Sequence, residues 1–301
     1  MRLASYSVAG ESSWGALVSG GIYDLKSHMP EYDTLRDAIE WQAFEAIDKL
    51  IEGDPAPHYS ISDVTFDPVI PNARQILCIG LNYEEHRLET RREKQGYPTV
   101  FARYAASQVG HGAPILLPPE STMLDYEGEL AIVIGKTCRR VPEEDAFSVI
   151  AGYACYNDAS IRDFQKHTSQ FHPGKNFPST GAFGPWLVTK DEIPDVEQLT
   201  IETRLNGQLV QSGTLGNLIY TLPQLVAYCS TFTELRAGDV IVTGTPGGVG
   251  MARQPQLWMK AGDDIVVDIK GVGLLSNTVL RESVDEVIDG ALVTKDQIRS
   301  V

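Results

Sequence analysis

Apolar and polar positions alternate in short runs over the first fifty residues. Residues 2–8 and 14–25 have the mixed pattern of short strands, whereas residues 34–53 place an apolar side chain at every fourth position. This stripe consists of Leu35, Ile39, Ala43, Ile47 and Ile51. Such spacing predicts one amphipathic helix, with Gly53 as its stop. We therefore expect a small N-terminal α+β domain.

Prolines interrupt the pattern directly after the predicted helix. Residues 52–75 contain four prolines and no periodic apolar positions, which is typical of an extended linker. An apolar strand begins at the end of this linker, so we place a domain boundary near residue 70. The predicted organisation is a small N-terminal domain with its linker over residues 1–70 and a larger domain over residues 71–301.

Ten short apolar runs, separated by glycine and proline, follow the boundary. They are residues 75–80, 99–104, 114–118, 128–135, 149–157, 184–189, 199–206, 239–244, 264–273 and 274–280. Helical character is limited to residues 141–150, 160–167 and 221–232. This pattern predicts a β-rich α+β fold, a sandwich or roll with helices on its flank, rather than an alternating parallel α/β sheet.

Composition and charge narrow the class of protein. The chain has 301 residues, of which 43% are hydrophobic and 22% charged, as in ordinary globular proteins. Forty acidic against 25 basic residues give a net charge of -15. This charge repels phosphate backbones and anionic membrane surfaces, so no nucleic acid or membrane partner is expected. We expect a cytoplasmic protein, because no signal-peptide pattern and no long apolar run occurs.

Three carboxylates are candidates for a metal site. Alternate side chains of a strand share a face, so Glu127 and Glu129 would project together, about 7 Å apart. Carboxylates this close repel unless a cation lies between them. Asp158 ends another apolar run and would supply a third oxygen ligand for Mg²⁺ or Mn²⁺. Each segment alone also fits an acidic surface, and zinc is disfavoured because neither has His or Cys at ligand spacing.

His86 and Glu89 are candidates for acid–base chemistry. They follow the first strand of the larger domain and lie three positions apart. On one helical turn this spacing places the carboxylate beside the imidazole, where it can orient the imidazole proton. A charged surface turn is the alternative, because several neighbouring residues are also charged.

Three further segments contain candidate ligands for an anionic substrate. Arg162 and Gln165 lie three positions apart on one predicted helical face. Lys175 is a cation in a loop rich in glycine and proline. Thr245 lies in a glycine-rich turn, whose backbone amides and hydroxyl could hold a carboxylate. That turn is not a P-loop, because no Lys-Ser or Lys-Thr pair follows its glycines.

Together, five blocks resemble the successive signature blocks of the fumarylacetoacetate hydrolase superfamily over about residues 71–281. The blocks are residues 77–86, 125–135, 152–165, 173–186 and 242–250. The resemblance implies a mixed β-sandwich roll, a homodimer and a catalytic domain over residues 71–301. It also implies Mg²⁺ or Mn²⁺ held by Glu127, Glu129 and Asp158, and Ca²⁺ could replace either ion under crystallisation conditions. The small N-terminal domain is similar to the extra domain of many bacterial members.

The acylpyruvase-like branch of this superfamily implies roles for the remaining candidates. A His and Glu pair on a closing lid activates water, which matches His86 and Glu89, and a lysine in the fourth block matches Lys175. The residues that match the lining of the substrate carboxylate are Arg162, Gln165 and Thr245. In this interpretation Arg162 clamps the substrate carboxylate and Lys175 stabilises the developing oxyanion.

The leading hypothesis is a metal-dependent hydrolase that cleaves a carbon–carbon bond in a 2,4-dioxo acid of the acylpyruvate type, a small anionic catabolic intermediate. The alternatives on the same site are decarboxylation of oxaloacetate, enol–keto isomerisation and hydration of a 2-hydroxydienoate. From a different class, a sandwich that binds a cation or small acid without turnover is a remote alternative.

Overall fold

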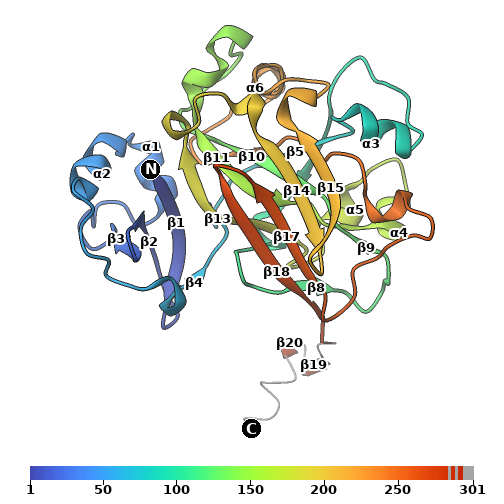
Figure 1. The fold of residues 1–301 in the computed structure, drawn as a ribbon, viewed down its shortest axis with the longest axis horizontal. Helices are drawn as coiled ribbons and strands as arrows, with labels where there is room; N and C mark the ends of the chain where they lie inside the picture. The colour runs from blue at the N-terminus through green and yellow to red at the C-terminus, as the bar shows by residue number, and fades with distance from the viewer. Residues whose placement is uncertain (284–285, 289–290, 294–301) are drawn as a thin grey trace.

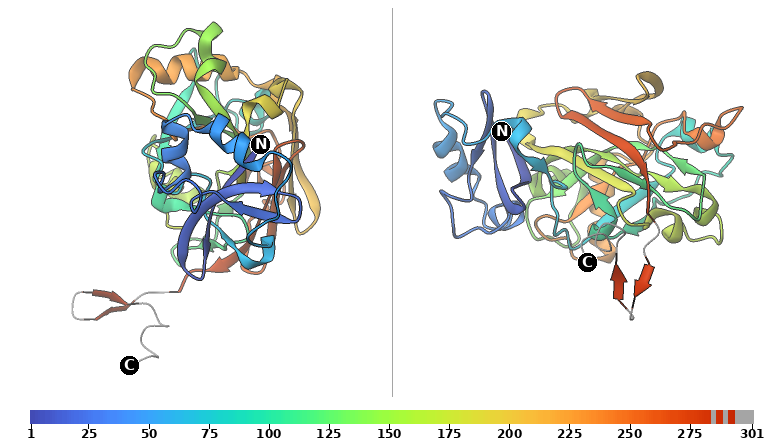
Figure 2. Two further views of the ribbon diagram at one scale, coloured as in Figure 1. Left: turned by 90° about the vertical axis from the view of Figure 1, so that its left-hand side faces the viewer. Right: turned by 90° about the horizontal axis from the view of Figure 1, so that it is seen from below.

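Two β-sheets packed face to face form the body of the molecule, with short helices at the edges (Figures 1 and 2). The computed structural model describes residues 1–283, 286–288 and 291–293, so the predicted end of the larger domain, residues 294–301, lies outside the described residues. Parallel and antiparallel pairs occur in both sheets. The predicted β-rich α+β fold, a mixed sandwich roll, is confirmed.

The large sheet has the strand order β3-β2-β1-β13-β11-β10-β16-β5-β6, with β4 beside β1 and β7 beside β13. Its strands are β1 (Arg2–Val8), β2 (Glu11–Val18), β3 (Gly21–Asp24), β4 (Thr65–Phe66), β5 (Ile76–Gly80), β6 (Thr99–Arg103), β7 (Gln108–Val109), β10 (Gly128–Ile134), β11 (Ile150–Asn157), β13 (Gly181–Thr189) and β16 (Val240–Val242). The central strand β10 is buried along its whole length. This burial explains why residues 128–135 read as a continuous apolar run after Glu129.

The second sheet has the order β15-β14-β17-β18-β8. Its strands are β8 (Ile115–Leu117), β14 (Thr200–Leu205), β15 (Gln208–Thr214), β17 (Asp264–Ile269) and β18 (Gly273–Arg281). Short pairs β9 (Leu124–Asp125) with β12 (Ser160–Ile161) and β19 (Glu286–Ile288) with β20 (Ala291–Val293) complete the strands of the described residues. All ten predicted strands are present. Strand β15 was not predicted, because four of its seven residues are polar.

The helices are α1 (Leu35–Glu40), α2 (Phe44–Ile51), α3 (Glu84–Glu89), α4 (Arg162–Gln165), α5 (His172–Lys175) and α6 (Leu222–Phe232). The predicted single helix over residues 34–53 is wrong, because α1 and α2 are separated by a turn. Gln42 has a φ of 54° in that turn. Its side-chain amide donates to the carbonyls of Ile39 and Gly135. A tertiary hydrogen bond to the loop after β10 thus accompanies the end of the first helix.

The first strand joins the N-terminal segment to the rest of the molecule. β1 pairs antiparallel with β13, with Leu3 opposite Leu187. Leu3 and Trp14 are fully buried in a core that also contains Phe183 and Val240. The N-terminal segment lies at the opposite end of the molecule from α3 and α4 (Figures 1 and 2). The boundary near residue 70 stays a prediction, and no helix of the described residues is long and apolar enough to span a membrane.

The shared core predicts that the N-terminal segment stabilises the whole chain. Leu3→Ala should lower the free energy of unfolding by about 2–5 kcal/mol, the usual cost of a cavity left by a buried leucine. Urea denaturation measures this change. As the control, Leu209→Ala should change it by less than about 0.5 kcal/mol, because Leu209 is 44% exposed. An unchanged midpoint for Leu3→Ala would show that β1 does not stabilise the sheet.

Candidate active site

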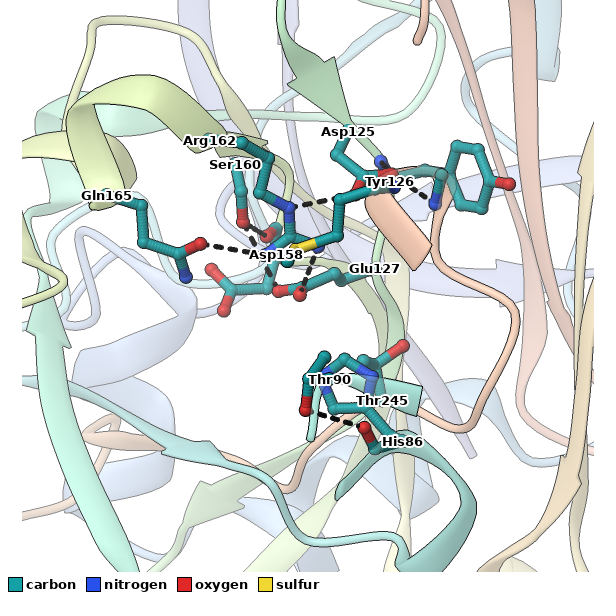
Figure 3. A network of polar contacts seen from close by, with 12 residues as sticks. His86, Thr90, Asp125, Tyr126, Glu127, Asp158, Ser160, Arg162, Gln165 and Thr245 are labelled. Carbon is teal, nitrogen blue, oxygen red and sulfur yellow. Dashed lines mark hydrogen bonds and ion pairs between the residues drawn. The ribbon is translucent and has the colours of Figure 1, made fainter. Parts of the chain in front are cut away.

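A cavity of about 360 Å³ lies at the end of the sandwich that carries α3, α4 and α5. Eight of the nine predicted site residues line it, all except Glu89: His86, Glu127, Glu129, Asp158, Arg162, Gln165, Lys175 and Thr245. Figure 3 shows His86 on one side of this space and Glu127 with Asp158 on the other. The chain thus brings together residues that are far apart in the sequence.

The predicted metal ligands Glu127, Glu129 and Asp158 form the base of the cavity. Their nearest carboxylate oxygens all lie within 4.8 Å of one another, and all three residues are buried. Gly128 separates the two glutamates and faces the second sheet, where a Cβ atom would lie 2.1 Å from Oγ1 of Thr203. Glycine therefore permits the close sheet contact, and the alternation of the strand turns both glutamates towards the cavity.

Lys175 and Arg162 neutralise Glu127. The Lys175 ammonium donates to Glu127 Oε2 at 2.5 Å and to Asp158 Oδ2 at 2.6 Å, and Arg162 Nη2 donates to Glu127 Oε1 at 2.7 Å. Burial alone raises the pKa of Glu127, but these two cations outweigh it and hold the pKa below its ordinary value. The same pairing raises the pKa of Lys175 against the opposing effect of its burial.

Arg103 is a buried residue of this cluster that the sequence analysis did not identify. It donates from Nη1 to Asp158 Oδ1 at 2.7 Å and from Nη2 to the Thr180 hydroxyl at 2.8 Å. Only 2% of the residue is exposed. Its position in the apolar run 99–104 could have identified it, because an arginine in a buried strand requires an acidic partner.

Glu129 is the carboxylate that lacks a cation. Among the described residues it has no ion pair, and its Oε2 accepts from the amide of Gly244 at 2.5 Å. Burial, together with the charges of Asp158 and Glu127, raises the pKa of Glu129 well above its ordinary value. A cation beside Glu129 would remove this penalty.

The charge and chemistry of the base fit a divalent hard cation. The buried carboxylates Asp125, Glu127, Glu129 and Asp158 face the buried cations Arg103, Arg162 and Lys175. This set has one excess negative charge, so a divalent ion would leave one positive charge for an anionic substrate. All three candidate ligands supply oxygen, which suits Mg²⁺ or Mn²⁺ better than zinc.

The glycine-rich turn after β16 holds carboxylates, as predicted for its backbone amides, but they belong to the protein itself. Besides the bond from Gly244 to Glu129, Gly248 N donates to Glu89 Oε2 at 2.8 Å and Gly250 N to Asp125 Oδ1 at 2.7 Å. The Thr245 hydroxyl donates to the Gly128 carbonyl at 2.9 Å. The turn therefore fixes the site, and the predicted contact of Thr245 with substrate stays a prediction.

His86 and Glu89 form the predicted pair on α3. His86 Nδ1 lies 2.8 Å from Glu89 Oε1, and the histidine is buried. Because a carboxylate accepts hydrogen bonds, Nδ1 is the donor in this contact, and a neutral ring would then keep its lone pair on Nε2. The second oxygen of Glu89 is held by Gly248. The alternative of a solvated surface turn does not fit this burial.

Arg162 and Lys175 form more hydrogen bonds within the protein than predicted. Lys175 directs its ammonium at three acceptors, since the Asp158 carbonyl also lies 3.0 Å from Nζ. Arg162 donates Nε to Asp125 at 2.8 Å and Nη1 to Gln165 at 3.0 Å, besides its bond to Glu127. Two of its five N–H groups have no acceptor within the described part of the chain. The predicted roles of both cations towards substrate stay predictions.

Comparisons with known proteins show the family to which the chain belongs. The family model "Fumarylacetoacetate (FAA) hydrolase C-terminal" matches residues 75–280. An oxaloacetate tautomerase of Bacillus subtilis is 42% identical over 73% of this chain and 75% of its own length. A mitochondrial oxaloacetate tautomerase of Xenopus laevis is 41% identical over 87% of this chain and 83% of its own.

Two solved structures resemble the whole fold, including the N-terminal segment. Fumarylacetoacetate hydrolase from Exiguobacterium antarcticum has a TM-score of 0.83 and 34% identity, covering 94% of this chain and 100% of that one. Maleylpyruvate hydrolase from a Sphingobium species, in complex with manganese(II) and pyruvate, has a TM-score of 0.79 and 26% identity over the same shares. On the family match and these identities, the chain belongs to the fumarylacetoacetate hydrolase family.

Proposed function

We propose that the protein is a divalent-metal-dependent hydrolase that cleaves a carbon–carbon bond in a 2,4-dioxo acid of the acylpyruvate type. The observation that carries this proposal is buried His86, which contacts Glu89 and lines the same cavity as the three carboxylates. Figure 3 shows His86 across this space from Glu127 and Asp158. Hydrolysis needs a base that faces both water and substrate. A protein that only binds a cation or a small acid has no such requirement.

Glu127, Glu129 and Asp158 would hold Mg²⁺ or Mn²⁺ in this proposal. The ion supplies a Lewis acid that polarises the 2-oxo acid and stabilises negative charge as it develops. The manganese and pyruvate in the maleylpyruvate hydrolase structure support this choice of metal and of substrate end. The two Arg162 N–H groups that have no acceptor among the described residues would bind the substrate carboxylate.

Proton transfer rests on His86. The hydrogen bond from Nδ1 to Glu89 fixes the orientation of the imidazole ring. Nε2 can then accept a proton from water. Gly248 in turn fixes Glu89 by donating to its second oxygen at 2.8 Å. The water then attacks the distal carbonyl carbon, the carbon–carbon bond breaks, and its electron pair stays on the pyruvate-like half as an enolate. Reprotonation of that enolate completes the reaction.

Tautomerisation of oxaloacetate is the second candidate. Two relatives with this activity in their names are 42% and 41% identical to the chain. In that reaction His86 would move a proton between carbon and oxygen of the substrate, with no attacking water. Decarboxylation of oxaloacetate and isomerisation or hydration of a 2-hydroxydienoate need the same metal and carboxylate ligands, and these reactions stay alternatives. The homodimer stays a prediction.

One assay series separates these reactions. The purified protein with Mg²⁺ or Mn²⁺ is given acylpyruvates and, separately, freshly dissolved enol-oxaloacetate. Release of pyruvate and a carboxylic acid supports hydrolysis. Accelerated loss of the enol absorbance, with no release of CO₂, supports the tautomerase instead. Absence of turnover on every member of the series would contradict the proposed chemistry.

The charges at the base of the cavity predict which carboxylate contributes most to the affinity for the metal. Glu129→Gln should weaken Mg²⁺ and Mn²⁺ binding by more than about a hundredfold, because even the outer partners of metal ligands are worth ten- to a hundredfold. Thermal stability should be kept or increased, since the substitution removes an unpaired buried charge. Isothermal titration calorimetry measures the affinity. Glu144→Gln, at an exposed position, is the control, and equal affinities of the two variants would reject the ligand assignment.

The position of His86 predicts that its removal lowers the reaction rate but leaves the metal affinity unchanged. His86→Ala should lower kcat by about a hundredfold or more, the usual loss when a general base is removed, while the metal affinity stays within the error of the wild type. Steady-state kinetics and calorimetry give the two values. His28→Ala, in the N-terminal segment, should change neither. Wild-type turnover by His86→Ala would show that another group activates water.

A further inference from the structure

Asn176 directly follows Lys175, and its side chain joins two segments that carry cations of the site. Its Oδ1 accepts from the backbone amide of Tyr104 at 2.7 Å, and its Nδ2 donates to the carbonyl of Ala102 at 3.1 Å. Nδ2 also donates to the carbonyl of His172, the first residue of α5, at 3.1 Å. One side-chain amide therefore holds α5 against the end of β6.

The edge position of β6 explains why a side chain makes these bonds. β6 is the last strand in the order of the large sheet, and among the described strands it pairs only with β5. The outer edge of such a strand presents backbone groups that have no strand partner. The carboxamide of Asn176 has the same donor and acceptor as a peptide group. It therefore takes the place of a neighbouring strand at Ala102 and Tyr104.

The two residues that this amide binds flank Arg103, which holds one oxygen of Asp158. Nη1 of Arg103 donates to Asp158 Oδ1 at 2.7 Å, and Nζ of Lys175 donates to Asp158 Oδ2 at 2.6 Å. Both oxygens of this predicted metal ligand are thus held by cations from different segments, β6 and α5. The orientation of the carboxylate consequently depends on how these segments lie relative to each other, and Asn176 bridges them beside both cations.

Other contacts between the two segments are less directional. His172 Nε2 lies 2.9 Å from the hydroxyl of Tyr104, but 59% of that tyrosine is exposed, so water can replace the contact. The rings of Phe101 and Phe171 pack edge-on with their centroids 5.7 Å apart. Such an aromatic contact has no donor and acceptor atoms to fix its position. The bonds of Asn176 to the backbone of β6 do fix it.

We infer that Asn176 is a positioning residue, which orients Asp158 for the metal by fixing Arg103 and Lys175 relative to each other. This role requires no contact with metal or substrate, and Asn176 is not among the residues that line the cavity. The inference rests on the proposed function, because it takes Asp158 to be a metal ligand. Residues that hold metal ligands in place commonly contribute ten- to a hundredfold to the affinity for the metal.

The sign of a charge effect gives a sharp test. Asn176→Asp keeps the acceptor for the Tyr104 amide, removes both donated bonds and adds a negative charge. That charge alone would strengthen the binding of Mg²⁺ or Mn²⁺, whereas loss of the positioning should weaken it. We expect the affinity measured by calorimetry to fall about tenfold or more in Asn176→Asp and in Asn176→Ala. Tighter binding by Asn176→Asp would show that only its charge matters, and would overturn the inference.

Asn217→Asp is the matched control, because it adds the same charge at an exposed asparagine outside this junction. It should keep the wild-type affinity for both ions. Equal weakening in Asn217→Asp and Asn176→Asp would show that the effect is not specific to the junction of α5 and β6, and would also overturn the inference.

Two further measurements distinguish positioning from a role in stability alone. Circular dichroism establishes the temperature at which each metal-free variant is folded, and the affinities are compared there. If Asn176→Ala does not fold, the nearly isosteric Asn176→Asp gives the same comparison. The electron paramagnetic resonance spectrum of bound Mn²⁺ reports the geometry of its ligands, and it should change in the Asn176 variants but not in Asn217→Asp. Lower stability with wild-type affinity and spectrum would show that Asn176 only stabilises the fold.

The remaining outcomes separate this inference from the proposed function. Wild-type affinity in both Asn176 variants, together with weak binding by Glu129→Gln, overturns the inference while the proposed function still holds. Weak binding by both Asn176 variants of a protein that cleaves no 2,4-dioxo acid supports the inference and rejects hydrolysis. Absence of Mg²⁺ and Mn²⁺ binding by the wild type overturns both, because the three carboxylates would then not be a metal site.

Discussion

The burial of four carboxylates in one place is the constraint on which the rest of the site depends. Each of these groups would cost several kcal/mol if it were buried alone and ionised. Asp125, Glu127 and Asp158 avoid this cost through Arg103, Arg162 and Lys175. Glu129 has a backbone amide but no cation among the described residues. The base of the cavity is therefore a network that lacks one positive charge among the described residues, and a divalent ion would supply it.

This constraint explains how distant segments of the chain are arranged. Arg103 comes from β6, Arg162 from α4 and Lys175 from α5, and all three reach carboxylates at the ends of β9, β10 and β11. The turn after β16 contributes amides rather than charges, and these amides also hold Glu89 behind His86. The predicted metal ligand Glu129 and the pair of His86 and Glu89 are consequently anchored by the same turn. A shift of that turn would move both parts of the site together.

Sequence patterns predicted much of this arrangement because it is local. The i, i+2 spacing of Glu127 and Glu129 and the i, i+3 spacing of His86 and Glu89 each lie within one element, where strand and helix geometry determine the neighbours. The missed features depend on tertiary contacts. The break after α1 is accompanied by a hydrogen bond from Gln42 to Gly135, and the importance of Arg103 appears only when β6 meets Asp158. The spacing of residues along the chain does not indicate such tertiary partners.

The base of the cavity differs from its opening in how the charges are paired. At the base, paired charges lie in a low-dielectric interior, so their geometry is fixed and the removal of one member leaves another unpaired. At the opening of the cavity, Arg91 and Arg92 are exposed and have no side-chain partner in the described part of the chain, so they can be substituted at little cost to the fold. A chain with a net charge of -15 repels small anions on average, and only a local excess of positive charge reverses that field near the cavity. Entry of the proposed anionic substrate would thus depend on residues that the stability of the fold does not need.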